Sequence, residues 1–371
     1  MKTILPLIVI LALNTAAAQE YYLLVGTYNS AKSEGIYVYR FSSKDGSAKE
    51  VSHIKASNPS FLTVSPDKRF VYAVNETGDS TGKGGHVSSF AFNTKNGTLT
   101  FVNSQSSEGN HPCYITTVKT GKWVLAGNYS TGNFCVLPVK KGKLGKATGM
   151  IQHIGSGPDT TRQKSPHVHG IFMQKDNKGF YVTDLGTDKV MDYQFNPKSG
   201  KVTPSNPPFI NMKPGSGPRH LVQHPDMPII YVLNELTGTM TAVLVKKKEN
   251  KILQINSTIP SDLKGSPGSA DIHLSPDNKF LYCTNRGNAN SIAIFSIDKN
   301  GIASPAGFTS TLGEKPRNFN ITPDGKFLLI ANQESNEIII FRRDENTGLL
   351  TNTGNKISIG KPVCLQWVNA D

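Results

Sequence analysis

One segment recurs along the chain about every fifty residues, and this period constrains the fold more than any other feature. Each copy contains a strand-like run, a turn such as Ser-Pro-Asp, a second aromatic-aliphatic run and then an Asn or Asp. The six clear copies begin at Asn58, His111, Val168, Gly217, Gly268 and Lys315. A period of this length, built from strand signals, is typical of a propeller or a solenoid.

The internal pattern of one copy predicts four short strands. In the copy that begins at Gly268, residues 271–274, 279–284 and 291–297 are strand-like runs bounded by Asn, Asp, Gly and Pro, and a weaker run follows near 307–311. Four antiparallel strands per repeat form a propeller blade, whose radial packing leaves only short, protected edges. We therefore predict an all-β propeller.

The two ends of the chain supply a seventh blade. Residues 21–28 and 35–41 have the pattern of strands, and the final segment 361–368 begins like another copy and then stops. We expect this last segment to pair with the N-terminal strand and so close the ring. The prediction is a seven-bladed β-propeller formed by a single domain over residues 19–371.

The first 18 residues have the pattern of a secretory signal peptide. Lys2 precedes an apolar run, and small residues follow it up to Ala16-Ala17-Ala18. The apolar run is too short for a stable transmembrane span, and no later segment approaches that length. We therefore predict export to the periplasm or the medium, without membrane association. We also expect a monomer, because a closed ring needs no partner to be stable.

Charge narrows the class of partner. The formal net charge is +13, and much of the Lys excess lies in connecting stretches such as 139–143 and 246–248, where Lys protects strand edges. No platform of interleaved basic and aromatic residues is present, so we expect no nucleic-acid binding. A preference for anionic small molecules fits the charge better.

The cysteines give no disulfide framework. Cys113, Cys135, Cys283 and Cys364 lie inside apolar strand-like runs. Export would permit disulfides, but buried free thiols are the favoured interpretation. The chain has no CxxC and no His/Cys spacing of metal-site type. We expect neither a metal nor a cofactor.

Superposing the copies on the Asp of the turn exposes two positions at which the blades differ. The first, at the start of the first strand, is Ser60, Cys113, His169, Arg219, Ala270 and Arg317 in chain order. The second, after the strand-end Asn or Asp, is Glu76, Tyr129, Leu185, Glu235, Arg286 and Gln333. Because the first strand runs one way and the second returns, both positions should lie at the same mouth of the central channel.

Five of these residues form the candidate site, on the arc of blades four to seven: His169, Arg219, Glu235, Arg286 and Arg317. A structural role in holding neighbouring blades together would explain any one of these residues alone. The five together favour a role in binding or catalysis. Clustered guanidinium groups suit a carboxylate or phosphate, and His169 is the natural general base, with a pKa that nearby Arg would lower. We add His167 and His220 as substrate contacts, His167 because a two-residue spacing on a strand would turn it to the same side as His169.

Several segments resemble a known family, the seven-bladed propeller lactonases of the bacterial 6-phosphogluconolactonase type, which are similar to the fungal carboxy-cis,cis-muconate cyclases. The most specific segments are YYLLVGTYNS, HGIFMQ, VTDLGTDKV, GPRHLVQHP, YVLNE and TNRG. The resemblance covers the mature chain. It implies that His169, Arg219, Glu235 and Arg286 take the places of the His, Arg, Glu and second Arg associated with catalysis in the cyclases, and it implies no required metal.

The resemblance thus implies hydrolysis of a small anionic sugar lactone to the open acid. His169 would activate water, and Arg219 and Arg286 would stabilise the oxyanion and hold an anionic group. Glu235 would orient an Arg or the water. Arg317 would be an accessory contact to the anion. Two alternatives stay open: lactonising cycloisomerisation of an unsaturated dicarboxylate, and a non-catalytic exported propeller that binds an anionic glycan or a protein. Export would separate the enzyme from cytoplasmic 6-phosphogluconolactone, so another lactone also remains a candidate substrate.

Overall fold

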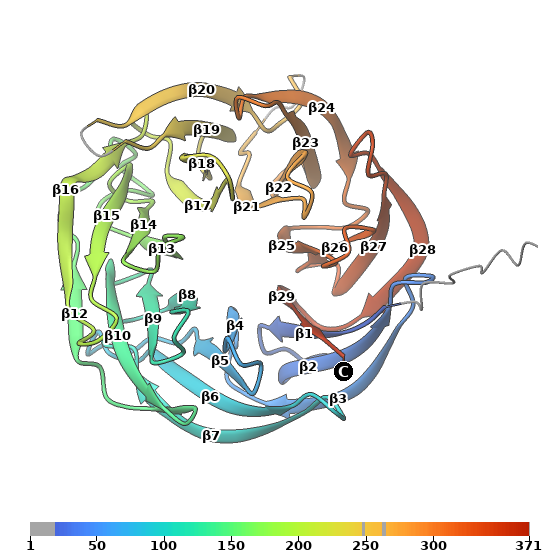
Figure 1. Cartoon of the computed structure of the whole chain (residues 1–371), viewed down its shortest axis with the longest axis horizontal. Coiled ribbons are helices and arrows are strands. Elements are labelled where there is room, and N and C mark those ends of the chain that lie inside the picture. Colours follow the sequence, from blue (N-terminus) through green and yellow to red (C-terminus); the bar gives the residue numbers. More distant parts are fainter. Residues whose placement is uncertain (1–18, 247–248, 262–264, 371) are drawn as a thin grey trace, which may run out of the picture.

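Seven antiparallel sheets surround a central axis (Figure 1). The computed structural model describes residues 19–246, 249–261 and 265–370, and the predicted signal peptide, residues 1–18, lies outside this part. Within it the secondary structure consists of strands, and no helix has the length and hydrophobicity to cross a membrane. The predicted all-β, seven-bladed propeller is confirmed.

Each blade begins with an inner strand beside the axis and continues with a second strand that returns antiparallel to it. In the order of blades one to seven, the inner strands are β29 (Pro362–Asn369), β4 (Leu62–Val64), β8 (Pro112–Thr117), β13 (Val168–Met173), β17 (Pro218–Gln223), β21 (Ser269–Leu274) and β25 (Pro316–Ile321). The second strands are β1 (Glu20–Thr27), β5 (Phe70–Asn75), β9 (Trp123–Asn128), β14 (Gly179–Asp184), β18 (Ile229–Asn234), β22 (Phe280–Asn285) and β26 (Phe327–Asn332).

The third and outermost strands form the rim in Figure 1. The third strands are β2 (Gly35–Ser42), β6 (His86–Asn93), β10 (Asn133–Lys140), β15 (Lys189–Phe195), β19 (Thr239–Leu244), β23 (Ser291–Ile297) and β27 (Glu337–Arg343). The outer strands are β3 (Ala48–Lys55), β7 (Thr98–Ser106), the pair β11 (Lys143–Leu144) and β12 (Gly149–Gln152), β16 (Val202–Asn211), β20 (Lys251–Ser257), β24 (Ala303–Ser310) and β28 (Leu350–Ser358). The weak fourth strand expected near 307–311 therefore begins earlier, at Ala303.

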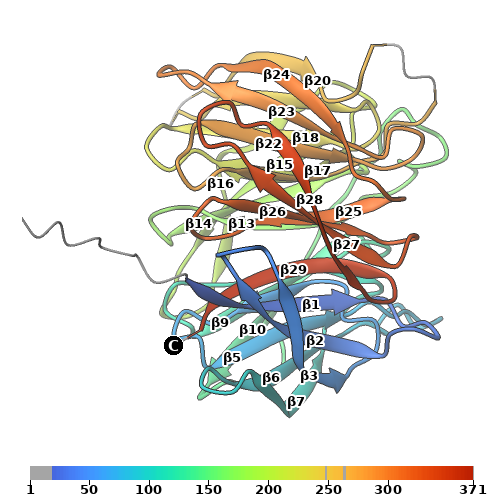
Figure 2. The ribbon, with the colours of Figure 1, turned by 90° about the vertical axis from the view of Figure 1, so that its right-hand side faces the viewer.

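The ring closes where the two ends of the chain pair. β29 lies antiparallel to β1, with Leu24 opposite Gln366, and Figure 2 shows the two strands side by side. Trp367 packs edge-on against Tyr21 and Phe41, at ring-centroid distances of 5.8 and 5.2 Å. The predicted closure of the first blade by the C-terminal segment is confirmed.

The recurring turn residues have a structural role. In the turn after β4, Ser65 Oγ accepts a hydrogen bond from Phe70 N at 2.9 Å and donates one to Asp67 Oδ1 at 2.7 Å. Thr322 makes the equivalent pair of bonds with Phe327 N and Asp324. These bonds fix the tight turn between the inner and second strands, as expected for Ser, Thr and Asp in turns. The turn serines are thus not nucleophiles.

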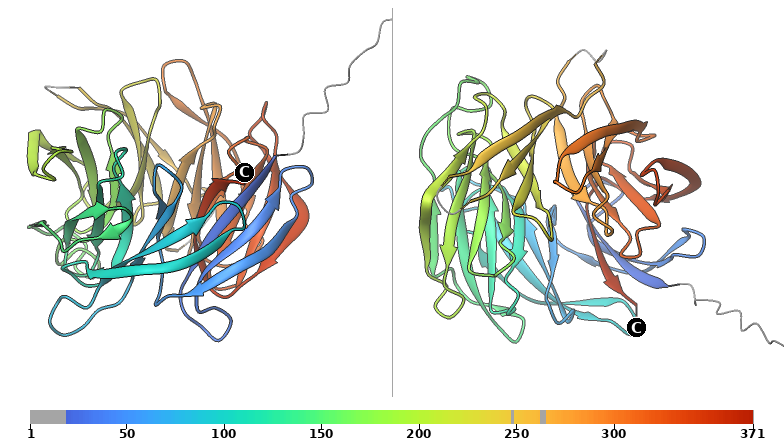
Figure 3. Two further views of the ribbon diagram at one scale, coloured as in Figure 1. Left: turned by 60° about the horizontal axis from the view of Figure 1, so that its bottom comes forward. Right: turned by 45° about the horizontal axis from the view of Figure 1, so that its top comes forward.

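The hydrophobic core lies between adjacent blades. At the closure, Leu23 of blade one and Leu329 of blade seven belong to one buried cluster that also contains Leu365. Similar clusters fill the other interfaces. The four cysteines are buried and unpaired, as the free-thiol interpretation predicts. Loops connect the strands on both faces of this rigid ring (Figure 3).

Candidate active site

The first variable position coincides with a bulge in the inner strand. One residue is skipped in the pairing of the inner and second strands in five blades, and it is Val363, Cys113, His169, Arg219 and Arg317 in blades one, three, four, five and seven. In blade six the register shifts at Ala270 and Asp271. A bulge re-aims a side chain out of the regular alternation, which turns this position toward the mouth of the ring.

Backbone hydrogen bonds hold the two variable positions of each blade together. The amide N–H of the second position donates to the carbonyl two residues before the bulge position in all seven blades. In blade five Glu235 N donates to Gly217 O at 2.8 Å, and in blade one Tyr28 N donates to Lys361 O at 3.0 Å. The prediction that both positions lie at one face of the ring is correct. The hydrogen bond of blade one also identifies Tyr28 as the residue at its second variable position, which the sequence comparison missed.

A cavity of about 190 Å³ opens at this mouth. Its lining consists of Glu76, Cys113, Tyr129, Arg162, His169, Glu235, Arg286 and Arg317. All except Arg162 occupy one of the two variable positions. The five predicted residues belong to blades four to seven, and blades two and three add Glu76, Cys113 and Tyr129 to the lining. The lining therefore comes from six of the seven blades.

Glu235 is the electrostatic centre of the cavity. Its Oε2 accepts hydrogen bonds from Arg219 Nε at 3.1 Å and lies 2.9 Å from Arg286 Nη2, while Oε1 accepts from Arg162 Nη2 at 2.6 Å. Burial alone would raise the pKa of Glu235, but Arg286, Arg219 and Arg162 outweigh it and lower this pKa to about 2. Glu235 is therefore an ionised acceptor that holds three guanidinium groups in place.

A second carboxylate anchors Arg317 on the other side of the cavity. Glu76 Oε2 lies 3.9 Å from Arg317 Nη2 and accepts a hydrogen bond from the Tyr28 hydroxyl at 2.8 Å. The Arg317 guanidinium also lies 5.4 Å from the centre of the Tyr28 ring. Although burial favours the neutral form, Tyr28 and Glu76 raise the pKa of Arg317. Arg317 is a permanent cation held over an aromatic face.

His169 has the properties of a base. It is 4% exposed, and its buried Nδ1 has no hydrogen-bond partner among the residues that the structure describes. Burial, followed by the charge of Arg219, lowers the pKa of His169 well below its ordinary value. The imidazole is thus neutral at physiological pH, and its ring borders the cavity while Nδ1 is left without a protein partner.

Aromatic side chains form the floor beneath His169. The His220 ring lies between His169, Phe61 and Tyr114, with ring-centroid distances of 5.3, 5.9 and 5.3 Å. Phe61 in turn stacks on Tyr114 at 4.2 Å. These four rings come from blades two to five and pack against one another next to the cavity.

Asp271 supports this floor from the opposite side. Its carboxylate accepts from His220 Nδ1 at 2.7 Å, lies 3.0 Å from His273 Nε2, and accepts from the side-chain amide of Asn318. The His220 Nε2 then lies 3.3 Å from Arg219 Nη1. Burial and Arg219 lower the pKa of His220 to about 4, which makes it a neutral bridge between Asp271 and Arg219.

Three predicted residues adjoin the cavity without lining it. Arg219 lies beneath Glu235 and is 2% exposed, and His220 lies in the floor. His167 precedes β13 instead of lying in it, so the argument from strand alternation was wrong. Its ring stacks on Tyr129 at 4.4 Å, and its Nδ1 lies 2.9 Å from Tyr129 O. Substrate contact by His167 and His220 stays a prediction.

Arg162 is the functional candidate that the repeats could not reveal. It lies in the connection between β12 and β13, which is longer than the equivalent connections between the other blades, and its side chain lines the cavity. Its position between Asp159 and a buried Gln163 gives no motif. The only available signal was the unusual length of this blade-four connection.

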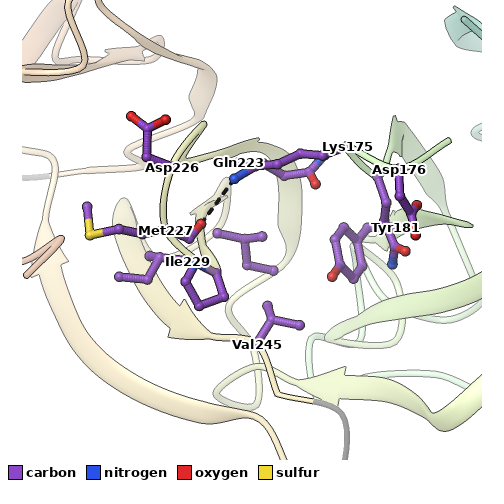
Figure 4. Close-up of a pocket in the computed structure, with 11 residues that line it drawn as sticks. Lys175, Asp176, Tyr181, Gln223, Asp226, Met227, Ile229 and Val245 are labelled. Atoms are coloured by element: carbon purple, nitrogen blue, oxygen red, sulfur yellow. Dashed lines mark hydrogen bonds between the residues drawn. The ribbon is translucent and has the colours of Figure 1, made fainter.

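A different cavity, of about 390 Å³, lies between the turns of blades four and five, at the far ends of β13 and β17 from the bulges (Figure 4). Its lysine, Lys175, donates to Pro225 O at 2.6 Å and to Met227 O at 3.2 Å, so this cation braces the two blades. No histidine lines this cavity among the described residues. This cavity therefore offers fewer side chains suited to catalysis than the cavity at the mouth does.

Metal-binding geometry is a separate question. Within residues 19–246, 249–261 and 265–370, no group of three or more His, Cys, Asp or Glu side chains is arranged to hold a metal ion. The lining of the mouth presents one imidazole, two carboxylates and three guanidinium groups. These can bind an anion, stabilise negative charge and accept a proton.

Residues 22–367 match the family described as "Lactonase, 7-bladed beta-propeller". The chain belongs to this family. It is 36% identical to the 6-phosphogluconolactonase of Formosa agariphila, covering 93% of this chain and 98% of the relative. It is 31% identical to the 6-phosphogluconolactonase of Bacillus subtilis, covering 94% of this chain and 99% of the relative. The predicted resemblance and the assignment to lactonase-type enzymes are confirmed.

The fold is also similar to that of a solved structure, the periplasmic gluconolactonase of Pseudomonas aeruginosa. The TM-score is 0.90 at 34% identity, and the match covers 95% of this chain and all of the other, 100%. The roles of individual side chains do not follow from this similarity. They are argued below from the geometry of the mouth.

Proposed function

We propose that the protein hydrolyses a sugar δ-lactone to the open-chain acid at the mouth of the ring, with His169 as the general base. The observation that carries this proposal is a neutral, buried histidine with an unpartnered Nδ1 that lines the same cavity as Arg286, Arg317 and Glu235. The names of the lactonase relatives support the reaction class, and they do not favour the cycloisomerase alternative.

The reaction needs one proton transfer in each direction. His169 takes a proton from water as the water oxygen forms a bond to the lactone carbonyl carbon. The tetrahedral oxyanion collapses, the bond between the carbonyl carbon and the ring oxygen breaks, and the leaving oxygen takes the proton from His169. The product is the open hydroxy acid, which ionises in water.

Arg286 and Arg317 face the cavity and are suited to stabilise the oxyanion. Preorganised donors of this kind contribute more than a base to many acyl transfers, and removing one donor costs about 10²- to 10³-fold in rate. We propose for Arg219 a role that differs from the substrate contact expected from the sequence. Because it lies beneath Glu235 and is 2% exposed, we assign it to holding Glu235 rather than the substrate.

Lactone opening by purified mature protein tests the proposal. Glucono-δ-lactone and its 6-phosphate are followed by pH-stat or NMR, with spontaneous opening subtracted. His169→Ala should lower kcat by about 10²- to 10⁴-fold, the usual contribution of a positioned base. The matched control is His53→Ala, which removes an exposed histidine on the outer strand β3. Full activity in a folded His169→Ala variant would contradict the base assignment.

Export of the enzyme is a separate proposal. The signal-peptide pattern of residues 1–18 supports it, and so does the similarity to a protein described as a periplasmic gluconolactonase. Expression of the full chain and of residues 19–371 in a Gram-negative host, followed by fractionation, tests it. Recovery of the full chain, uncleaved, in the cytoplasm would contradict it.

A further inference from the structure

We propose that Arg162 is a specificity-determining residue, which binds the phosphate of a phosphorylated sugar lactone at the outer end of the cavity. The inference rests on the proposed lactonase function and extends it to the substrate class. Four features of the molecule carry it: an anchored loop, an excess of positive charge, unused donors on Arg162, and a graded exposure of the cations.

The loop that presents Arg162 is anchored along its length. At its start, buried His153 lies between Asp184 and Tyr193, with His153 Nδ1 2.8 Å from Asp184 Oδ2 and Nε2 3.1 Å from the Tyr193 hydroxyl. At its end, His167 N donates to the other oxygen of Asp184 at 2.8 Å. One buried carboxylate therefore holds both ends of the loop.

The residue next to Arg162 fixes the middle of the loop. Gln163 is fully buried, and its Nε2 donates to Leu185 O and to Asp188 Oδ1, both at 2.8 Å. Asp188 also accepts from the backbone N–H groups of Gly215 and Gly217 in blade five. The base of Arg162 is thus fixed by two blades, so its guanidinium is held over the mouth before any ligand arrives. Preorganisation of this kind reduces the entropy lost on binding.

The charge of the cavity lining favours an anionic group. Three guanidinium groups, of Arg162, Arg286 and Arg317, and two carboxylates, of Glu76 and Glu235, line the cavity, which leaves an excess of one positive charge (3 − 2). A phosphate monoester carries roughly −1.5 to −2 at neutral pH. An anionic phosphate would neutralise this excess, whereas an uncharged lactone would not.

Arg162 has donors to spare for such a group. Both of its side-chain hydrogen bonds, to Glu235 Oε1 at 2.6 Å and to the Tyr129 hydroxyl at 3.3 Å, use Nη2. Its Nε and Nη1 make no hydrogen bond with the residues that the structure describes. Arg162 can therefore keep its contact with Glu235 through Nη2 and still donate from Nε or Nη1 to a phosphate oxygen, a charge-assisted hydrogen bond.

Exposure places Arg162 at the outer end of the cavity. Its side chain is 42% exposed, against 17% for Arg286 and for Arg317, while His169 is buried. In a lactone phosphorylated on its exocyclic carbon, the phosphate and the carbonyl lie on opposite sides of the ring oxygen. With the carbonyl near His169, the phosphate points outward to Arg162.

The test compares glucono-δ-lactone 6-phosphate with glucono-δ-lactone as substrates of the wild-type protein and three variants. Hydrogen bonds to charged groups contribute about 1.5–3 kcal/mol, so Arg162→Gln should lower kcat/KM for the phosphorylated lactone by about 10- to 100-fold. The loss for the unphosphorylated lactone should be smaller, because that substrate loses only the support that Arg162 gives to Glu235. Arg162→Lys, which keeps the charge, should lie between. Lys164→Gln, which removes an exposed cation from the same loop, is the matched control.

Each result decides for or against the assignment. Equal losses on the two substrates would overturn it, because Arg162 would then act only by holding Glu235. If the wild-type protein opens neither lactone, the proposed function fails, and calorimetry with 6-phosphogluconate and gluconate tests the contact without turnover. Tighter binding of the phosphorylated acid that Arg162→Gln removes would still support the phosphate contact. Equal affinity for the two acids would overturn it.

Discussion

Arg219 and Glu235, one on the inner strand of blade five and the other directly after its second strand, form an ion pair with Nε and Oε2 3.1 Å apart, and neither side chain is more than 6% exposed. Arg162 and Arg286 share the same carboxylate. The pair therefore does more than link two strands. It supplies the charge that allows several guanidinium groups to converge on one small cavity.

Replacing Glu235 by Gln should destabilise the fold and abolish lactone opening. The change leaves three guanidinium groups around a neutral amide, and loss of one partner of a buried ion pair typically costs about 3–5 kcal/mol. Urea unfolding at neutral pH measures this. Glu76→Gln is the control, since Glu76 is 3.9 Å from its arginine and should cost less. Equal losses for the two variants would contradict the central role of Glu235.

The pH dependence of kcat/KM should reflect the lowered pKa of His169. A general base works in its neutral form, and burial together with Arg219 keeps His169 neutral well below its ordinary pKa. We therefore expect kcat/KM to change less than about twofold between about pH 6 and 7.5, with the acid limb below the usual histidine value of about 6.5. Stopped assays at low temperature limit spontaneous opening. A half-maximal rate near pH 6.5 would assign the limb to an ordinary, exposed histidine.

The same histidines should make the fold less stable in acid. His169 and His220 bind protons less readily in the folded state than in the unfolded state, the pKa of His220 being lowered to about 4. Between about pH 6.5 and 4 the unfolded chain therefore holds more protons, so the free energy of unfolding falls as the pH is lowered. Urea midpoints across this range measure the effect. His169→Gln should flatten the dependence, and an unchanged slope would argue against it.

Asp271→Ala should remove the support of the aromatic floor. The change leaves His220 Nδ1 and the Asn318 amide without their shared acceptor, and each buried donor left unsatisfied should cost about 1–3 kcal/mol. It should also lower kcat, because His220 would no longer be fixed against Arg219. Asp176→Ala, in an exposed turn, should have little effect on either. A folded Asp271→Ala variant with full kcat would show that the floor is not needed for catalysis.

Leu365→Ala should weaken the closure of the ring. Leu365 is fully buried in the cluster shared by blades one and seven, and Leu→Ala changes in such positions cost about 2–5 kcal/mol. Val51→Ala, on the outer strand of blade one, should change stability by only about 0.5 kcal/mol. Thermal unfolding compares the two. A loss no larger than that of Val51→Ala would mean that closure contributes little.

The repeat allowed most of the fold to be predicted. The turn sequence and the strand-end Asn recur because every blade needs the same tight turn, so the blades and their closure by residues 361–368 followed directly. Superposition also identified the positions of His169, Arg219, Glu235, Arg286 and Arg317, since differences between otherwise similar copies stand out. These positions could be found without knowing that a bulge lies at the first of them.

The remaining features depended on departures from the repeat. Arg162 lies in a connection that is longer before blade four than before the other blades, so no other copy has a residue to compare with it. His167 was assigned to a strand that begins one residue later, at Val168, so strand alternation does not apply to it. Tyr28 occupies the second variable position of blade one, which was never superposed on the others. Interactions such as the approach of Arg162 to Glu235 are long-range and leave no local pattern.

The bulges have a consequence for how such a protein can change over evolution. The skipped residue, such as Arg219 or Val363, takes no part in the strand pairing that holds its blade together. Its side chain can therefore be exchanged without a cost to the sheet. A ring of this kind therefore has several exchangeable side chains around one cavity. A new substrate specificity requires new residues at these bulge positions rather than a new fold.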